Sequence, residues 1–94
     1  MADSISLNAH PGEHVEVALQ STPGTGAIWR LAPGVREPDS LKEQREPTPG
    51  IGGAVTQLFT FCYARPGSYE LAFDLKRPWE PEVRNHVRVT VEVR

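Results

Sequence analysis

The chain has 94 residues, of which 38% are hydrophobic, and its ten Lys+Arg against twelve Asp+Glu give a formal net charge of −2. This length suits one domain around one core, here residues 1–94. The basic residues are scattered and form no positive stripe, which disfavours nucleic-acid binding, and no apolar run is long enough to cross a bilayer.

Period-two alternation of apolar and polar residues predicts a series of short strands. In chain order, we expect an edge strand over residues 4–8 and further strands over 15–19, 28–31, 54–63, 69–76 and 86–94. Residues 40–46, with the sequence SLKEQRE, fit either a short helix or a charged edge strand, and the pattern leaves both open.

Pro-Gly pairs fall between these runs, for example Pro11-Gly12 and Pro66-Gly67. Proline presets φ at the second position of a turn and glycine supplies a positive φ at the third, so each pair predicts a chain reversal. Short strands with such frequent turns predict an all-β fold, an immunoglobulin-like antiparallel β-sandwich of about seven strands. Successive antiparallel strands reverse direction, so alternate connections should share an end. One end should gather residues 21–26, 47–53 and 77–82, and the other end residues 10–12, 33–39 and 64–67.

The connections expected at the first of these ends have an unusual composition. They read TPGTG at 22–26, PGIGG at 49–53 and RPWEP at 77–81. Glycines let another backbone approach closely, and an exposed tryptophan is a typical interface anchor. Each loop alone also fits an ordinary turn, and Trp79 alone also fits a ring folded back onto the sandwich. Together, the three loops predict an end that binds another protein.

The same segments, in the same order, resemble those of the chagasin-type inhibitors of papain-like cysteine proteases. That family carries an NPTTG-like loop before an aromatic-bearing strand, a GxGG loop before a Phe-rich strand, and an RPW loop. The corresponding segments here are TPGTGAIW at 22–29, GIGGAVTQLFTF at 50–61 and LKRPWE at 75–80. The resemblance covers nearly the whole chain from Gly12 onward, and it too implies an immunoglobulin-like sandwich.

The resemblance implies a reversible, non-covalent inhibitor whose three loops form a wedge in the substrate cleft of the protease. The first loop would lie over the catalytic cysteine, the other two would grip the walls, and the tryptophan would stack on an aromatic side chain. The protease-binding residues carried over are Thr22, Pro23, Gly24, Thr25, Gly26, Gly50, Gly52, Gly53, Arg77, Pro78 and Trp79. Thr22 replaces the family's asparagine and Gly24 replaces its first threonine, which predicts a less preorganised first loop.

No catalytic, metal or cofactor site is expected. His10 and His14 are four residues apart, but a Pro-Gly pair between them breaks any helix and no third ligand is near. Cys62, the single cysteine, excludes an intrachain disulfide and fits a half-buried thiol in a strand. Arg77 and Glu80 are expected to rim the interface or to pair with each other.

Two rivals to inhibition remain from the sequence: an immunoglobulin-like adhesin or assembly module, and a catalytically silent domain from a larger enzyme. We expect a monomer whose partner is a papain-like cysteine protease, with no nucleic acid, membrane or cofactor. The chain as written starts without the charged and apolar regions of a signal peptide, which predicts a cytoplasmic location. A mature periplasmic or secreted form would look the same.

Overall fold

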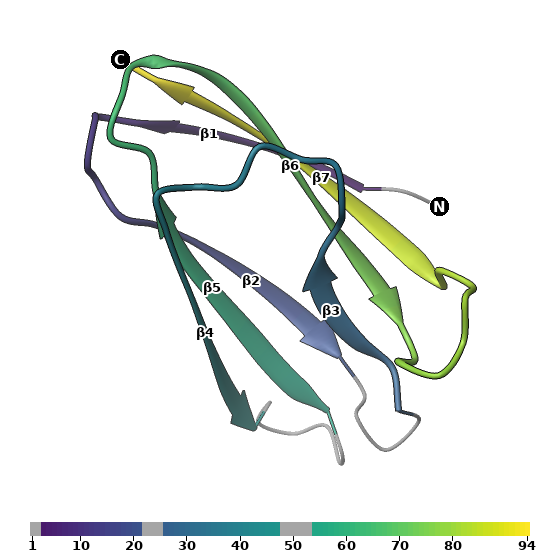
Figure 1. Ribbon diagram of the computed structural model, residues 1–94. Coiled ribbons are helices and arrows are strands. Elements are labelled where there is room, and N and C mark those ends of the chain that lie inside the picture. Colours follow the sequence, from purple (N-terminus) through teal and green to yellow (C-terminus); the bar gives the residue numbers. More distant parts are fainter. Residues whose placement is uncertain (1–2, 22–25, 48–53) are drawn as a thin grey trace.

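The computed structural model describes residues 3–21, 26–47 and 54–94. Over these residues the chain forms seven β-strands and no helix, and therefore no helix that could span a membrane. The strands are β1 (Asp3–Ala9), β2 (Val15–Ser21), β3 (Ile28–Leu31), β4 (Ser40–Pro47), β5 (Val55–Cys62), β6 (Gly67–Lys76) and β7 (Asn85–Val93). They form one sheet of order β1-β7-β6-β3 and one of order β2-β5-β4, packed as a sandwich (Figure 1). The all-β, immunoglobulin-like fold is thus confirmed.

One strand pairing departs from the antiparallel pattern. β1 runs parallel to β7, from Asp3 opposite Val87 to Ala9 opposite Val93. The sequence predicted an edge strand here but not its partner; strands that reverse direction in turn give the first and seventh strands the same direction, as observed. Residues 10–14 carry the chain from the larger sheet to β2 in the smaller sheet and do not form a hairpin, so β1 pairs with β7 and not with β2.

The segment that the sequence left open between helix and strand is the edge strand β4. It pairs antiparallel with β5, from Ser40 opposite Cys62 to Pro47 opposite Val55. Side chains from Leu41 to Pro47 are all exposed, so neither face shows the apolar alternation of a half-buried strand. Hydrogen bonding to β5 therefore decides the conformation here against the helix propensity of the residues.

The core lies between the sheets and is built from alternate, inward-facing residues. Phe61 of β5, Leu71 and Phe73 of β6 and Val89 of β7 are completely buried. The rings of Phe59 and Phe73 meet across the sandwich, with their centroids 4.5 Å apart. These positions match the alternation seen in the sequence, and truncating one of the large side chains to alanine is expected to cost about 2–5 kcal/mol of unfolding free energy.

A buried glutamine ties the short edge strand β3 to the opposite sheet. Gln57 of β5 accepts a hydrogen bond from the backbone N–H of Trp29 at 2.8 Å and donates one to the carbonyl of Trp29 at 3.1 Å. Its amide also donates to Glu43 Oε2 at 3.0 Å. The indole N–H of Trp29 donates to the carbonyl of Gln20 at 2.8 Å. The Gln57 side chain therefore supplies hydrogen-bond partners for the backbone of β3 on the side where no strand pairs with it. It also fixes β3 where the chain re-enters the sandwich after the first loop.

Candidate functional site

The three connections singled out in the sequence leave and re-enter the sandwich at one end (Figure 1). In the smaller sheet, Ser21 at the end of β2 and Pro47 at the end of β4 both pair with Val55 at the start of β5. In the larger sheet, Ile28 at the start of β3 pairs with Lys76 at the end of β6. The strand-direction argument is therefore confirmed for the strand ends that carry these loops.

Parts of two of the loops lie outside the residues that the structure describes. These residues are Thr22, Pro23, Gly24 and Thr25 of the first loop and Gly50, Gly52 and Gly53 of the second. Their assignment to protease binding stays a prediction. The described members of the predicted set are Gly26, Arg77, Pro78 and Trp79.

The loop between β6 and β7 is held in place by backbone bonds and by charge. The N–H of Glu80 donates to the carbonyl of Arg77 at 3.0 Å, which closes a turn with Pro78 at the position that suits its fixed φ. Arg77 Nη1 lies 3.0 Å from Glu80 Oε1, and Arg84 Nη2 lies 3.6 Å from Glu80 Oε2. The N–H of Arg84 donates to the carbonyl of Leu75 at 2.7 Å. The expected Arg77–Glu80 pair is confirmed, and the turn is a firm platform for the residue at its tip.

Trp79 occupies the tip of this turn and is 69% exposed. Its indole does not enter the core, and the six-membered ring lies against Gly26, the last residue of the first loop. Gly26 has a φ of +86°, and a Cβ there would collide with Trp79 Cη2. Glycine is thus required at this position both by the backbone and by the ring. The contact joins the first and third loops, and neither loop sequence alone signals it.

Further exposed apolar side chains lie on the same loop. Val83 is 47% exposed, and Pro78 and Pro81 are also exposed. A large ring on a fixed turn loses little conformational freedom when it is buried, which favours binding. Within the described ranges, no group of His, Cys, Asp and Glu side chains is arranged to hold a metal ion. The arrangement is suited to docking against another protein.

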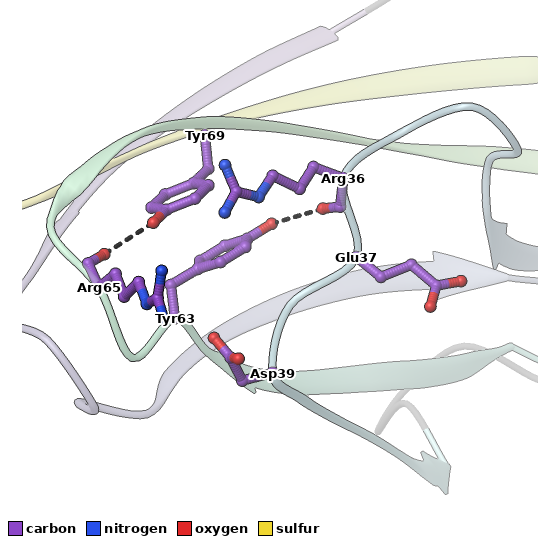
Figure 2. Close-up of a pocket in the computed structure, with 6 residues that line it drawn as sticks. All are labelled: Arg36, Glu37, Asp39, Tyr63, Arg65 and Tyr69. Atoms are coloured by element: carbon purple, nitrogen blue, oxygen red, sulfur yellow. Dashed lines mark hydrogen bonds between the residues drawn. The ribbon is translucent and has the colours of Figure 1, made fainter.

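At the opposite end of the sandwich, the aromatic side chains are buried and hydrogen-bonded (Figure 2). The rings of Tyr63 and Tyr69 stack with centroids 3.9 Å apart. The Tyr69 hydroxyl donates to the carbonyl of Arg65 at 2.8 Å, four residues upstream, as in the tyrosine corner of immunoglobulin-like domains. The Tyr63 hydroxyl donates to the carbonyl of Arg36 at 3.0 Å, and the Arg36 guanidinium lies 4.9 Å from the centre of the Tyr69 ring. Burial, with the neighbouring Tyr69 second, raises the pKa of Tyr63 to about 12.

These side chains line a polar cavity of about 220 Å³ that the sequence did not predict. Both tyrosine hydroxyls already donate to backbone carbonyls. The cavity therefore results from the hydrogen bonds that hold the turn between β5 and β6 against the connection between β3 and β4. The end that carries the exposed Trp79 is the better candidate for binding.

Comparison with known proteins agrees with this architecture. Residues 8–93 match the family model described as chagasin family peptidase inhibitor I42. The cysteine protease inhibitor EhICP2 from Entamoeba histolytica is similar in structure over 99% of this chain and 96% of its own, with a TM-score of 0.69 and 16% identity. The solution structure of Amebosin is similar over 99% of this chain and 88% of its own, with a TM-score of 0.63 and 23% identity. No curated protein matches the sequence.

Proposed function

We propose a function from one premise: the chain belongs to the chagasin family of peptidase inhibitors. We infer that it inhibits papain-like cysteine proteases, reversibly and without a covalent bond. In this proposal, the end of the sandwich that carries Trp79 enters the substrate cleft. The cysteine protease inhibitor among the structures of similar fold supports a cysteine protease as the target.

The observation that carries the proposal is the exposed indole of Trp79. It stands on a turn closed by the Glu80 N–H and braced by the Arg77–Glu80 pair, so its position is set before any partner arrives. A preset anchor lowers the ordering cost of binding. Aromatic anchors of this kind typically cost about 2 kcal/mol or more of binding free energy when they are removed.

The other loops complete the proposed wedge. As the family resemblance implies, Thr22–Gly26 would lie over the catalytic cysteine. Gly50, Gly52 and Gly53 would present bare backbone to one wall of the cleft. The ring of Trp79 would stack on an aromatic side chain of the opposite wall, an arrangement that contributes about 0.5–1.5 kcal/mol beyond its burial.

Titration of the chain against papain tests the proposal, with Trp79→Ala as the diagnostic variant. We expect inhibition by the unaltered chain, recovery of papain activity on dilution, and an inhibition constant about tenfold higher or more for Trp79→Ala. The midpoint of thermal unfolding should stay the same in the variant, because the indole is mostly exposed.

Leu41→Ala is the matched control, since Leu41 is 39% exposed on β4, away from the loops. It removes exposed apolar surface and should leave the inhibition constant unchanged. No inhibition at micromolar excess would contradict the proposal and favour an interaction module on the same fold. Equal inhibition by the unaltered chain and Trp79→Ala would contradict the wedge.

A further inference from the structure

The most exposed element of the fold is the edge strand β4. It pairs with β5 on one side and with no described strand on the other (Figure 1). An edge of this kind presents a row of free backbone donors and acceptors, which is a template for adding another strand. The edge strand β3 differs, because it has only four residues and the Gln57 side chain binds both backbone groups of Trp29.

The charges along β4 are ordered so that the strand is complementary to itself. Residues 42–46 read Lys, Glu, Gln, Arg, Glu. When two copies pair antiparallel about Gln44, Lys42 of one copy lies opposite Glu46 of the other. In the same register, Glu43 lies opposite Arg45. The two-fold axis repeats each pair, and opposite charges facing each other across strands are stabilising.

Symmetry leaves few other registers. When two identical strands pair antiparallel, the two-fold axis is perpendicular to the sheet and lies midway between the strands. Residues opposite each other therefore point to the same face, and the axis lies between the two copies of one central residue. If the central residue were charged, its charge would lie directly opposite the same charge of the second copy, which is destabilising. This excludes Lys42, Glu43, Arg45 and Glu46. Within residues 42–46, Gln44 is the one centre that avoids this repulsion.

The described contacts leave part of this charge available to a second copy. Lys42 and Glu46 form no ion pair within the part of the chain that the structure describes. Glu43 and Arg45 lie on the other face and already meet at 2.6 Å. They border an open groove of about 350 Å³ between β3 and β4, so neither sheet covers them. A second copy would extend this pair into a ladder and give Lys42 and Glu46 their partners.

We propose that β4 is a self-association edge, where two copies of this chain pair antiparallel about Gln44. The two three-stranded sheets then form one continuous sheet. The sequence alone predicted a monomer. A contact through one edge strand buries less than the roughly 1,200–2,000 Å² of a stable interface, so the dimer is weak and depends on concentration. Pairing reverses the strand direction, so the two Trp79 ends point away from each other and stay free.

Sedimentation equilibrium of the whole chain, from about 10 µM to about 1 mM, measures this association. Two variants keep the composition, the net charge and Glu43. Arg45→Glu with Glu46→Arg places like charges opposite each other at both pairs. Lys42→Glu with Glu46→Lys reverses one pair and keeps every pair opposite in sign. We expect the second variant to associate like the unaltered chain, and the first to have a dimer dissociation constant about tenfold higher or more.

The unaltered chain should rise from 10.4 kDa toward twice that mass, and added salt should lower the association. Gln44→Lys, a single exposed change, should also weaken it by placing like charges at the centre, and it replaces the first variant should that one fail to fold. A mass that stays at 10.4 kDa at the highest concentration would overturn the proposal. Equal association of the two charge-exchanged variants would also overturn it, because the contact would then lie elsewhere.

Discussion

The two ends of the sandwich carry their aromatic side chains in opposite ways. Tyr63 and Tyr69 are 3% and 6% exposed, they stack on each other, and each hydroxyl donates to a backbone carbonyl (Figure 2). Trp79 is 69% exposed and rests on Gly26. Buried rings with satisfied hydroxyls stabilise the fold, whereas an exposed ring contributes its burial energy only when a partner covers it. Under the proposed function, folding and binding depend on different ends, and mutation should separate them.

Tyr69→Ala should give the largest effect and should act on stability alone. It removes a buried ring, its stack on Tyr63 and the hydroxyl bond to Arg65, so the free energy of unfolding should fall by about 3–5 kcal/mol. Urea unfolding followed by tryptophan fluorescence measures this loss. Under conditions where the variant is folded, its inhibition constant should equal that of the unaltered chain, the reverse of the result expected for Trp79→Ala.

Tyr69→Phe separates the ring from the hydroxyl. It keeps the stack and loses only the bond to the Arg65 carbonyl, so we expect a loss of about 0.5–1.5 kcal/mol. A weaker inhibition constant for folded Tyr69→Ala would mean that the two ends are coupled, and the separation argued above would be wrong.

Gly26→Ala tests the contact that joins the first and third loops. A Cβ at this position collides with the indole of Trp79, which must then move, and the φ of +86° disfavours any L side chain. We expect about tenfold weaker inhibition and a loss of about 1–2 kcal/mol of unfolding free energy from the backbone. In the Trp79→Ala background, the same change should affect inhibition much less, which a double-mutant cycle measures.

D-Alanine at position 26 is the matched control, introduced by ligating synthetic segments at Cys62. A D-residue accepts a positive φ and directs its methyl group away from the side on which the ring lies. Inhibition should therefore remain close to that of the unaltered chain. If Gly26→Ala weakens inhibition equally with and without the indole, position 26 acts through the first loop and not through Trp79.

The sequence was sufficient for the fold because alternation and turn chemistry are local signals. The valines of β7 and the Phe59–Phe61 alternation of β5 appear in the structure as inward-facing residues. The pairing of β1 with β7 was missed, because alternation along the chain gives the direction of a strand but not its neighbour in the sheet. Residues 40–46 stayed undecided for a related reason, since pairing with β5 determines their conformation.

The sequence predicted which loops form the candidate site but fewer of the contacts between their residues. Strand counting placed the loop ends together, and of the two roles expected for Arg77 and Glu80, at the rim of the interface or in a pair, the structure shows the pair. The contact between Trp79 and Gly26 joins residues 53 positions apart and follows from the close approach of two loops, for which the sequence carries no period or motif. The role of Gln57 was also missed, because a glutamine at an inward position of a strand gives no signal of its hydrogen-bond partners.

Gly24→Thr tests a difference within the proposed binding end, between the first loop and the third. Gly24 stands where the family carries threonine, and it lies outside the described residues. Replacing glycine reduces the freedom of the unbound loop, which is worth about 0.4–1 kcal/mol where the conformation accepts the new side chain. We expect about two- to fivefold tighter inhibition of papain. Gly24→Ala separates the gain in rigidity from any contact of the threonine side chain, and weaker inhibition by both variants would contradict the family geometry for this loop.

The last effect belongs to the tyrosine end and appears only at alkaline pH. Burial raises the pKa of Tyr63 from 10.0 to about 12 in the folded chain, so the folded state keeps its proton where the unfolded state loses it. This contribution to stability is complete below about pH 10 and is lost as the pH rises toward about 12. Tyr63→Phe has no proton to lose at this position, so its urea midpoint should fall less between pH 9.5 and 11.5 than that of the unaltered chain.

Trp79→Ala is the control, because an indole does not titrate in this range, and its midpoint should follow the unaltered chain. If Tyr63→Phe and the unaltered chain lost stability equally over this pH range, other groups would cause the alkaline loss of stability, and the fold would not hold the Tyr63 hydroxyl neutral.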